Sequence, residues 1–246
     1  MATAAQTFRP YHAHDRAFFL VMAAAAWAAI LSGFGPELYQ HGRGVSPFPA
    51  WIVLVHGAAF FGWLILFTLQ VWLIRSRRLA LHRSLGLIAF ALAPAMVVLG
   101  LVANTVAQRG HFLAGQSQLN FMIVPIIDMV NFGALAGFGL ALRKRQAAHK
   151  RLMLLATICL LDAGFGRTLG TWMLPIVGDG FWGFMAQLFL GYDLLIVIAM
   201  LYDQATRGRV HPVYWVALPL LLAGQLLSSA LYHAPGWIPV ARWLIS

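Results

Sequence analysis

Two histidines stand where apolar segments begin, each beside basic residues. His82 is followed by Arg83, and His149 is followed by Lys150 and Arg151. Neutral imidazole is a common metal ligand, and cofactor sites in helical bundles take their ligands from facing helices. The pair His82 and His149 is therefore a candidate ligand set for the iron of a b-type haem. Arg83, Lys150 and Arg151 are cations that could pair with its propionates.

One histidine at a membrane surface is more often a capping or snorkelling group than a ligand. Two histidines at equal depth on different helices favour a shared cofactor. A weak internal repeat supports equal depth, because WLIRSRRLALHRSLG and GLALRKRQAAHKRLM each join an apolar helix, a basic loop and a histidine. Short inner loops also collect basic residues without any duplication, and that alternative stays open.

A second group of ionisable residues lies inside apolar segments, at His56, Asp128 and Arg167. A charge at a helix centre costs about 2.5–3.5 kcal/mol on insertion scales, so such residues normally find partners. The three share a similar predicted depth in the outer half, and an Asp128–Arg167 ion pair with His56 nearby is expected. The layer either binds a substrate, proton or cofactor propionate, or holds helices together. No residue is assigned a catalytic role.

Helical geometry also connects His149 with Arg167. Eighteen residues separate them, which is about five turns and about 27 Å of continuous helix. They are thus expected on one face of one helix, at opposite sides of a bilayer core about 30 Å thick.

The elements that carry these residues are predicted to be transmembrane helices. The chain has 246 residues, of which 61% are apolar and only 10% charged, with a mean hydropathy of +0.78. Soluble domains carry about 25% charged residues, so we expect an all-α integral membrane protein forming one domain over 1–246. Seven spans are expected, with a core formed by helices two to five. Their ranges are roughly 17–34, 50–74, 85–107, 120–142, 152–175, 181–202 and 212–232.

The first span could be a signal peptide, but its apolar run exceeds the usual h-region of about 7–15 residues, which favours a retained helix. Thirteen of the 17 Lys and Arg residues fall on one side of the predicted spans. The positive-inside rule therefore predicts an inner N-terminus and an outer C-terminus in the cytoplasmic (inner) membrane. Basic residues confined to short loops argue against a nucleic-acid partner, despite a net charge of +10.

The histidine motifs also support a family resemblance. They comprise His56, His82-Arg83-x-x-Gly86, His149-Lys150-Arg151-Leu152-Met153 and Arg167. In these residues, across spans two to five, the chain resembles the cytochrome b561-like membrane proteins and related bacterial families with a helix-opening His-Arg motif. The resemblance implies an inner haem b held by His82 and His149, and an outer haem with His56 as one ligand. The b561 pattern has four histidines on four consecutive helices, whereas the fourth helix here has none. Met122 or Met129 would substitute, or the outer haem is absent.

The predicted function is therefore a membrane-embedded haem protein that transfers electrons, with quinone or another small carrier as partner. A transporter or small-molecule binder using His56, Asp128 and Arg167 is the alternative. A metal-dependent hydrolase with His56 and Asp128 as ligands is weaker, because the sequence has no HExxH motif. A retinal protein is excluded, because the only lysines, Lys144 and Lys150, lie in an inner loop region.

Overall fold

The protein is a bundle of long apolar helices, seen in a computed structural model that describes residues 8–45 and 49–246. Six helices are long and apolar enough to cross a membrane, or seven if the bent pair α6 and α7 forms one span. The elements are α1 (Asp15–Gly42), α2 (Trp51–Arg75), α3 (Leu79–Leu85), α4 (Ile88–Leu113), η1 (Leu119–Met122), α5 (Ile123–Ala141), α6 (Gln146–Ile158), α7 (Asp162–Val177), α8 (Phe181–Arg207), α9 (Pro212–His233) and α10 (Trp237–Leu244).

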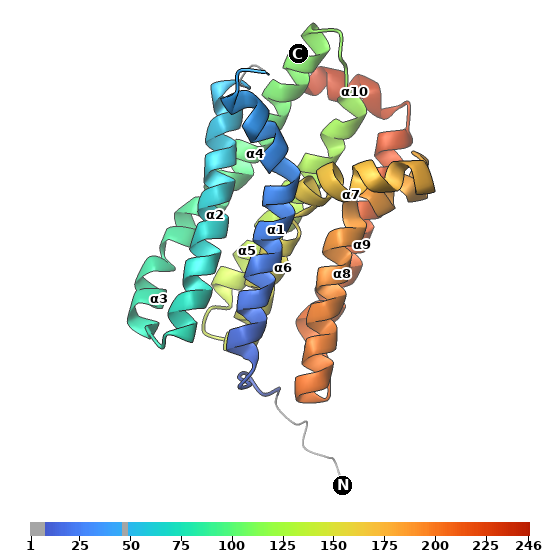
Figure 1. The fold of residues 1–246 in the computed structure, drawn as a ribbon. Helices are drawn as coiled ribbons and strands as arrows, with labels where there is room; N and C mark the ends of the chain where they lie inside the picture. The colour runs from blue at the N-terminus through green and yellow to red at the C-terminus, as the bar shows by residue number, and fades with distance from the viewer. Residues whose placement is uncertain (1–7, 46–48) are drawn as a thin grey trace.

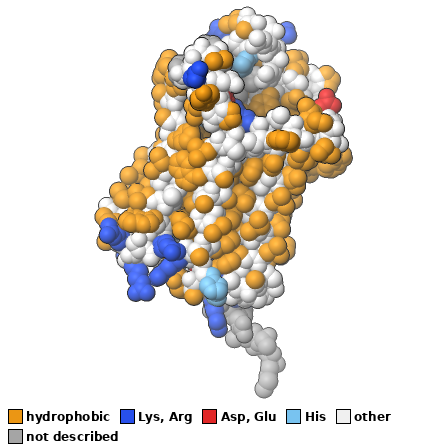
Figure 2. Space-filling view, viewed as in Figure 1, with side chains coloured by type: hydrophobic (Ala, Val, Ile, Leu, Met, Phe, Trp, Pro, Cys, Tyr) orange, Lys and Arg blue, Asp and Glu red, His pale blue; other side chains and the backbone are white. Residues whose placement is uncertain are grey.

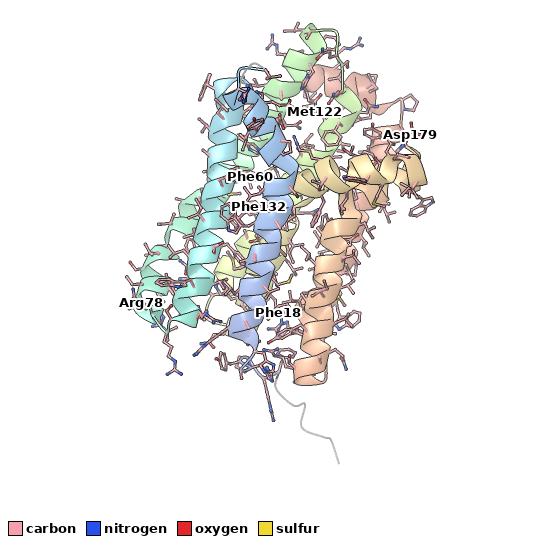
Figure 3. All side chains as sticks on the ribbon, in the orientation of Figure 1. Phe18, Phe60, Arg78, Met122, Phe132 and Asp179 are labelled. Atoms are coloured by element: carbon pink, nitrogen blue, oxygen red, sulfur yellow. The ribbon has the colours of Figure 1, made fainter. Side chains whose placement is uncertain are left out.

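Exposed apolar side chains cover the middle of the face shown in Figure 2, and Lys and Arg gather toward its ends. A lipid-facing surface has this pattern, because hydrocarbon cannot solvate charged groups. The start of α1 and the C-terminus lie at opposite ends of the bundle (Figure 1). The turns after α2 and α5 and the chain before α1 meet at one end, where Arg78 is labelled in Figure 3. We call this the basic end.

Helix α6 is the centre of the bundle. Almost every residue from Arg151 to Asp162 is buried, and α6 packs against α5, α8, α1, α2 and α9. The core is therefore wider than the predicted helices two to five, because α1, α8 and α9 also supply buried residues such as Ala26, Ile196 and Leu221.

The predicted single helix over 152–175 is broken. Helix α6 ends at Ile158, α7 begins at Asp162, and their axes differ by 48°. Tight i→i+3 hydrogen bonds mark the break, from the Leu160 and Leu161 N–H groups to the carbonyls of Thr157 and Ile158. From there α7 runs across the direction of its neighbours (Figure 1). The expectation that His149 and Arg167 share one face of one straight helix is therefore wrong.

Two elements were not predicted. The seven-residue helix α3 carries His82 in the basic turn before α4, and α10 packs against η1 at the opposite end. Both are too short to produce a span-length apolar run.

Candidate functional site

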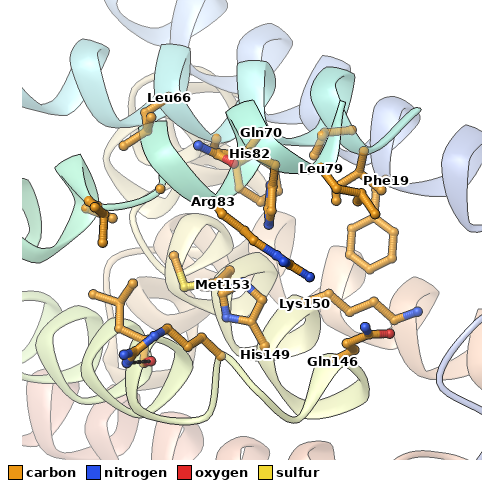
Figure 4. A pocket seen from close by; sticks show the side chains of 18 of the residues that line it. Phe19, Leu66, Gln70, Leu79, His82, Arg83, Gln146, His149, Lys150 and Met153 are labelled. Atoms are coloured by element: carbon orange, nitrogen blue, oxygen red, sulfur yellow. Dashed lines mark hydrogen bonds between the residues drawn. The ribbon is translucent and has the colours of Figure 1, made fainter. Parts of the chain in front are cut away.

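The structure brings His82 and His149 together. Their ring centres lie 6.5 Å apart, with ring planes at 77°. His82 projects from α3 and His149 from the first turn of α6, so the two rings enter one cavity from opposite walls (Figure 4). The proximity follows from packing α2 and its α3–α4 hairpin beside the α5–α6 hairpin.

The hydrogen bond of His149 fixes which nitrogen is available. Its Nδ1 lies 2.7 Å from the carbonyl oxygen of Gly139 in α5. A carbonyl only accepts, so Nδ1 carries the proton and donates it. The lone pair of Nε2 is then free. Histidines that bind metals commonly donate their second nitrogen to a carbonyl in this way.

His82 is held by the amide of Gln70, a polar residue inside α2. In one orientation the amide nitrogen donates to the His82 carbonyl at 3.0 Å and to Nδ1, and the amide oxygen accepts from the Gly86 N–H at 3.0 Å. In this orientation Nδ1 of His82 accepts, so its ring proton lies on Nε2. Binding a metal through Nε2 would require the other tautomer of His82 and a turned Gln70 amide. Gln70 was not predicted as a site residue, although a lone glutamine in an apolar span was a usable signal.

The cavity has a volume of about 1310 Å³. Typical small-molecule sites measure about 300–1,000 Å³, so this one can hold a ligand of macrocycle size. Apolar and aromatic side chains form most of its walls, among them Phe19, Trp63, Phe67 and Met153. Most of the wall around the histidines is therefore apolar.

The polar side of the cavity is strongly basic. One carboxylate, Asp15, lines it, against six cations: Arg16, Arg77, Arg83, Arg143, Lys144 and Lys150. Arg83 and Lys150, the predicted propionate partners, both line the cavity. The ammonium group of Lys150 is bound by Asp15 at 2.7 Å and by the Pro10 carbonyl at 2.6 Å.

Arg151, the third predicted partner, does not line the cavity. Its side chain is 2% exposed and makes a two-pronged ion pair with the equally buried Asp203 of α8, including an Nε–Oδ2 bond of 2.7 Å. Its role is to join α6 to α8. The sequence signal for Asp203 was an acid in the last turns of an apolar span.

The spacing of the two imidazoles fits a shared metal. A metal–nitrogen bond is about 2 Å long, and the ring centre of an imidazole lies about 1.1 Å beyond its nitrogen. Two imidazoles on opposite sides of one metal therefore have ring centres about 6.3 Å apart. The observed 6.5 Å is close to this value. Within 8–45 and 49–246, no group of three or more His, Cys, Asp or Glu residues could hold a metal ion. A two-histidine set instead suits a metal whose remaining ligands come from a macrocycle, as in haem.

The predicted outer layer is not assembled. The Nε atom of Arg167 lies 3.5 Å from Glu37 of α1, its guanidinium lies over the Phe34 ring at 4.1 Å, and its side chain is 46% exposed. Asp128 instead lies beside Asp162. The predicted Asp128–Arg167 ion pair is wrong, because the break in α6–α7 carries Arg167 toward α1.

His56 has the Phe60 ring as its close neighbour, with centres 4.2 Å apart, and its Nδ1 is buried without a hydrogen-bond partner. Met122 and Met129 are buried, and the Met129 sulfur lies against Gly100 of α4. An outer haem on these residues stays a prediction.

Another polar contact within the bundle was not predicted. The amide nitrogen of Gln225 in α9 donates to Asp193 at 2.8 Å and to the Tyr192 hydroxyl, both in α8. These hydrogen bonds join α8 to α9, in line with polar contacts between membrane helices.

Comparison with protein-family models, with curated proteins and with solved structures finds no match for this chain. The resemblance to cytochrome b561-like proteins therefore stays a prediction from the histidine motifs.

Proposed function

We propose that this protein binds one b-type haem between His82 and His149 and transfers electrons through it in the cytoplasmic membrane. The observation that carries the proposal is the 6.5 Å spacing of two imidazoles across a large apolar cavity. The hydrogen bond from His149 to Gly139 adds to it, because it leaves Nε2 free to bind iron.

Each part of the cavity has a role in this proposal. His82 and His149 would hold the haem iron, and Arg83 would pair with a propionate, as would Lys150 alongside its bond to Asp15. Gln70 and Gly139 orient the rings, and the aromatic walls exclude water and so tune the redox potential. The haem supplies one-electron chemistry. A small carrier such as a quinone is the proposed partner, because membrane electron carriers reach such a site through the lipid.

The alternative of a transporter depends on a layer of His56, Asp128 and Arg167. These residues are not gathered, since Arg167 pairs with Glu37 and Asp128 contacts Asp162. No contact described here favours that function over electron transfer.

The test is the absorption spectrum of protein purified in detergent from cells supplied with haem precursor, first oxidised and then reduced with dithionite. We expect a Soret band and split reduced bands in the wild type. His82→Ala and His149→Ala should each lose more than about nine-tenths of the haem, because low-spin ligation requires both imidazoles.

His111→Ala is the matched control, because His111 is exposed in the last turn of α4 and outside the cavity. It should keep the wild-type spectrum. A folded, colourless wild type would refute the proposal, as would full haem content in both cavity variants.

A further inference from the structure

The cavity opens beside residues of two contrasting kinds. Its lining includes the exposed apolar side chains of Leu79, Leu87 and Phe90, which are 51%, 64% and 43% exposed. It also includes the exposed cations Arg77, Arg143 and Lys144, from the turns after α2 and α5. The opening is thus apolar toward the lipid and basic toward the end of the bundle.

These cations have no carboxylate partner. Among the ion pairs of the described residues, none includes Arg77, Arg143 or Lys144. Arg143 lies over the Phe90 ring at 5.2 Å, at the lip of the opening. In the same lining, the Nε atom of Arg16 is buried without a hydrogen-bond partner. The cavity lining therefore contains cationic side chains that have no carboxylate partner among the described residues.

Arg77 also has an unusual backbone. Its φ is 59°, the only positive φ at a non-glycine residue in the described chain. Glycine adopts this conformation without a steric cost, whereas an arginine there is strained. The N–H of Arg78 donates to the Leu73 carbonyl at 2.8 Å, so Arg77 occupies the left-handed position that commonly ends a helix. The cap places the Arg77 side chain in the lining of the cavity.

We propose that an acidic phospholipid of the adjoining leaflet binds this opening. Its phosphate lies among Arg77, Arg143 and Lys144, and an acyl chain follows Leu79, Leu87 and Phe90. Basic pockets between transmembrane helices take anionic headgroups for the same electrostatic reason. A phospholipid is favoured over a soluble anion because the opening is apolar on the side that faces the bilayer. The proposal does not require haem.

The test is thermal unfolding of the full chain in detergent, titrated with short-chain phosphatidylglycerol, phosphatidylcholine of equal chain length, or inorganic phosphate. Phosphatidylglycerol should raise the unfolding midpoint in a saturable way. In the double variant Arg77→Gly with Lys144→Gln, apparent affinity should fall by about 30-fold, because each cation contributes roughly fivefold. The lipid-free midpoint should stay equal or rise, because glycine relieves the strain at position 77.

The matched control is Arg78→Gln with Arg145→Gln, which removes the same charge from the same two turns but outside the lining. It should keep the wild-type lipid response. An equal response to phosphatidylcholine, an equal response to inorganic phosphate, or an equal loss in the control would each overturn the proposal. His82→Ala should keep the lipid response, which separates this result from failure of the haem proposal.

Discussion

At the scale of single residues, the basic end is held by buried charges that satisfy one another. Asp15 accepts from Lys150 at 2.7 Å, from Arg207 at 2.7 and 2.8 Å, and from the Tyr202 hydroxyl at 2.7 Å. Buried ions need such partners, because removing one leaves an uncompensated charge. Through Asp15 the start of α1 is fixed to α6 and α8, beside the cavity that carries the histidines.

His211, which caps α9 by accepting the Val213 N–H at 3.1 Å, makes stability at this end depend on pH. Burial is the largest cause that lowers the pKa of His211 from 6.5 to about 4, and the Arg151 guanidinium is the second. The Asp203 carboxylate raises this pKa, whereas Lys150 and Arg207 lower it further. The unfolded chain therefore binds a proton between pH 6.5 and about 4 that the folded protein does not. Folding stability should fall as the pH drops through this window.

The variant His211→Asn should reduce that loss, because asparagine keeps the cap acceptor but does not titrate. The measurement is the unfolding midpoint from pH 7 to 4. His111→Asn, at an exposed site, should follow the wild-type profile. A His211→Asn profile with the wild-type slope would contradict the assignment.

At the scale of elements, α7 is joined to α1 by a contact between two glycines. A Cβ atom on Gly33 of α1 would lie 2.5 Å from the Gly164 carbonyl oxygen, and one on Gly164 would lie 2.5 Å from that of Ala29. The two backbones therefore touch, as small residues allow in membrane helix pairs. The same pair of helices also carries the Arg167–Glu37 ion pair.

We expect Gly33→Ala to destabilise the protein by about 1–3 kcal/mol, the usual cost of overpacking. Gly35→Ala is the control in the same helix, because nothing lies within 4 Å of a Cβ added there. It should be neutral or slightly stabilising, since alanine is the better helix former. Unfolding in mixed micelles measures both, and equal effects would show that the glycine contact is not limiting.

At the scale of the whole molecule, the orientation in the membrane determines which side the cavity faces. The cavity lies at the basic end, and the positive-inside rule predicts that this end faces the cytoplasm. The turn holding Lys144 follows α5, and the turn holding Gln116 precedes it, so one transmembrane helix separates them.

Single cysteines should report this orientation in a Cys159→Ala background. On intact cells, a membrane-impermeant maleimide should label Gln116→Cys and spare Lys144→Cys. Opening the cells should make Lys144→Cys reactive. If only Lys144→Cys were labelled on intact cells, the protein would have the opposite orientation to the one predicted.

The sequence predicted more of the inner site than of the outer one. His82 and His149 each follow a basic turn, so their similar depth was predicted from the chain alone, and the structure brings the two rings together. The prediction of an outer polar layer was wrong because it assumed one straight helix from His149 to Arg167. The break after Ile158 contains no proline, and the close contact of α7 with α1 joins residues far apart in sequence.

By itself, the sequence determined a multi-pass membrane protein and the positions of most of its helices, because apolar runs and basic turns act locally on each segment. Tertiary structure alone decided which polar groups meet. It paired Arg151 with Asp203, sent Arg167 to Glu37, and placed Gln70 against His82. The physical reason is that a side chain's partners depend on the rotation, tilt and breaks of packed helices, which hydropathy does not encode.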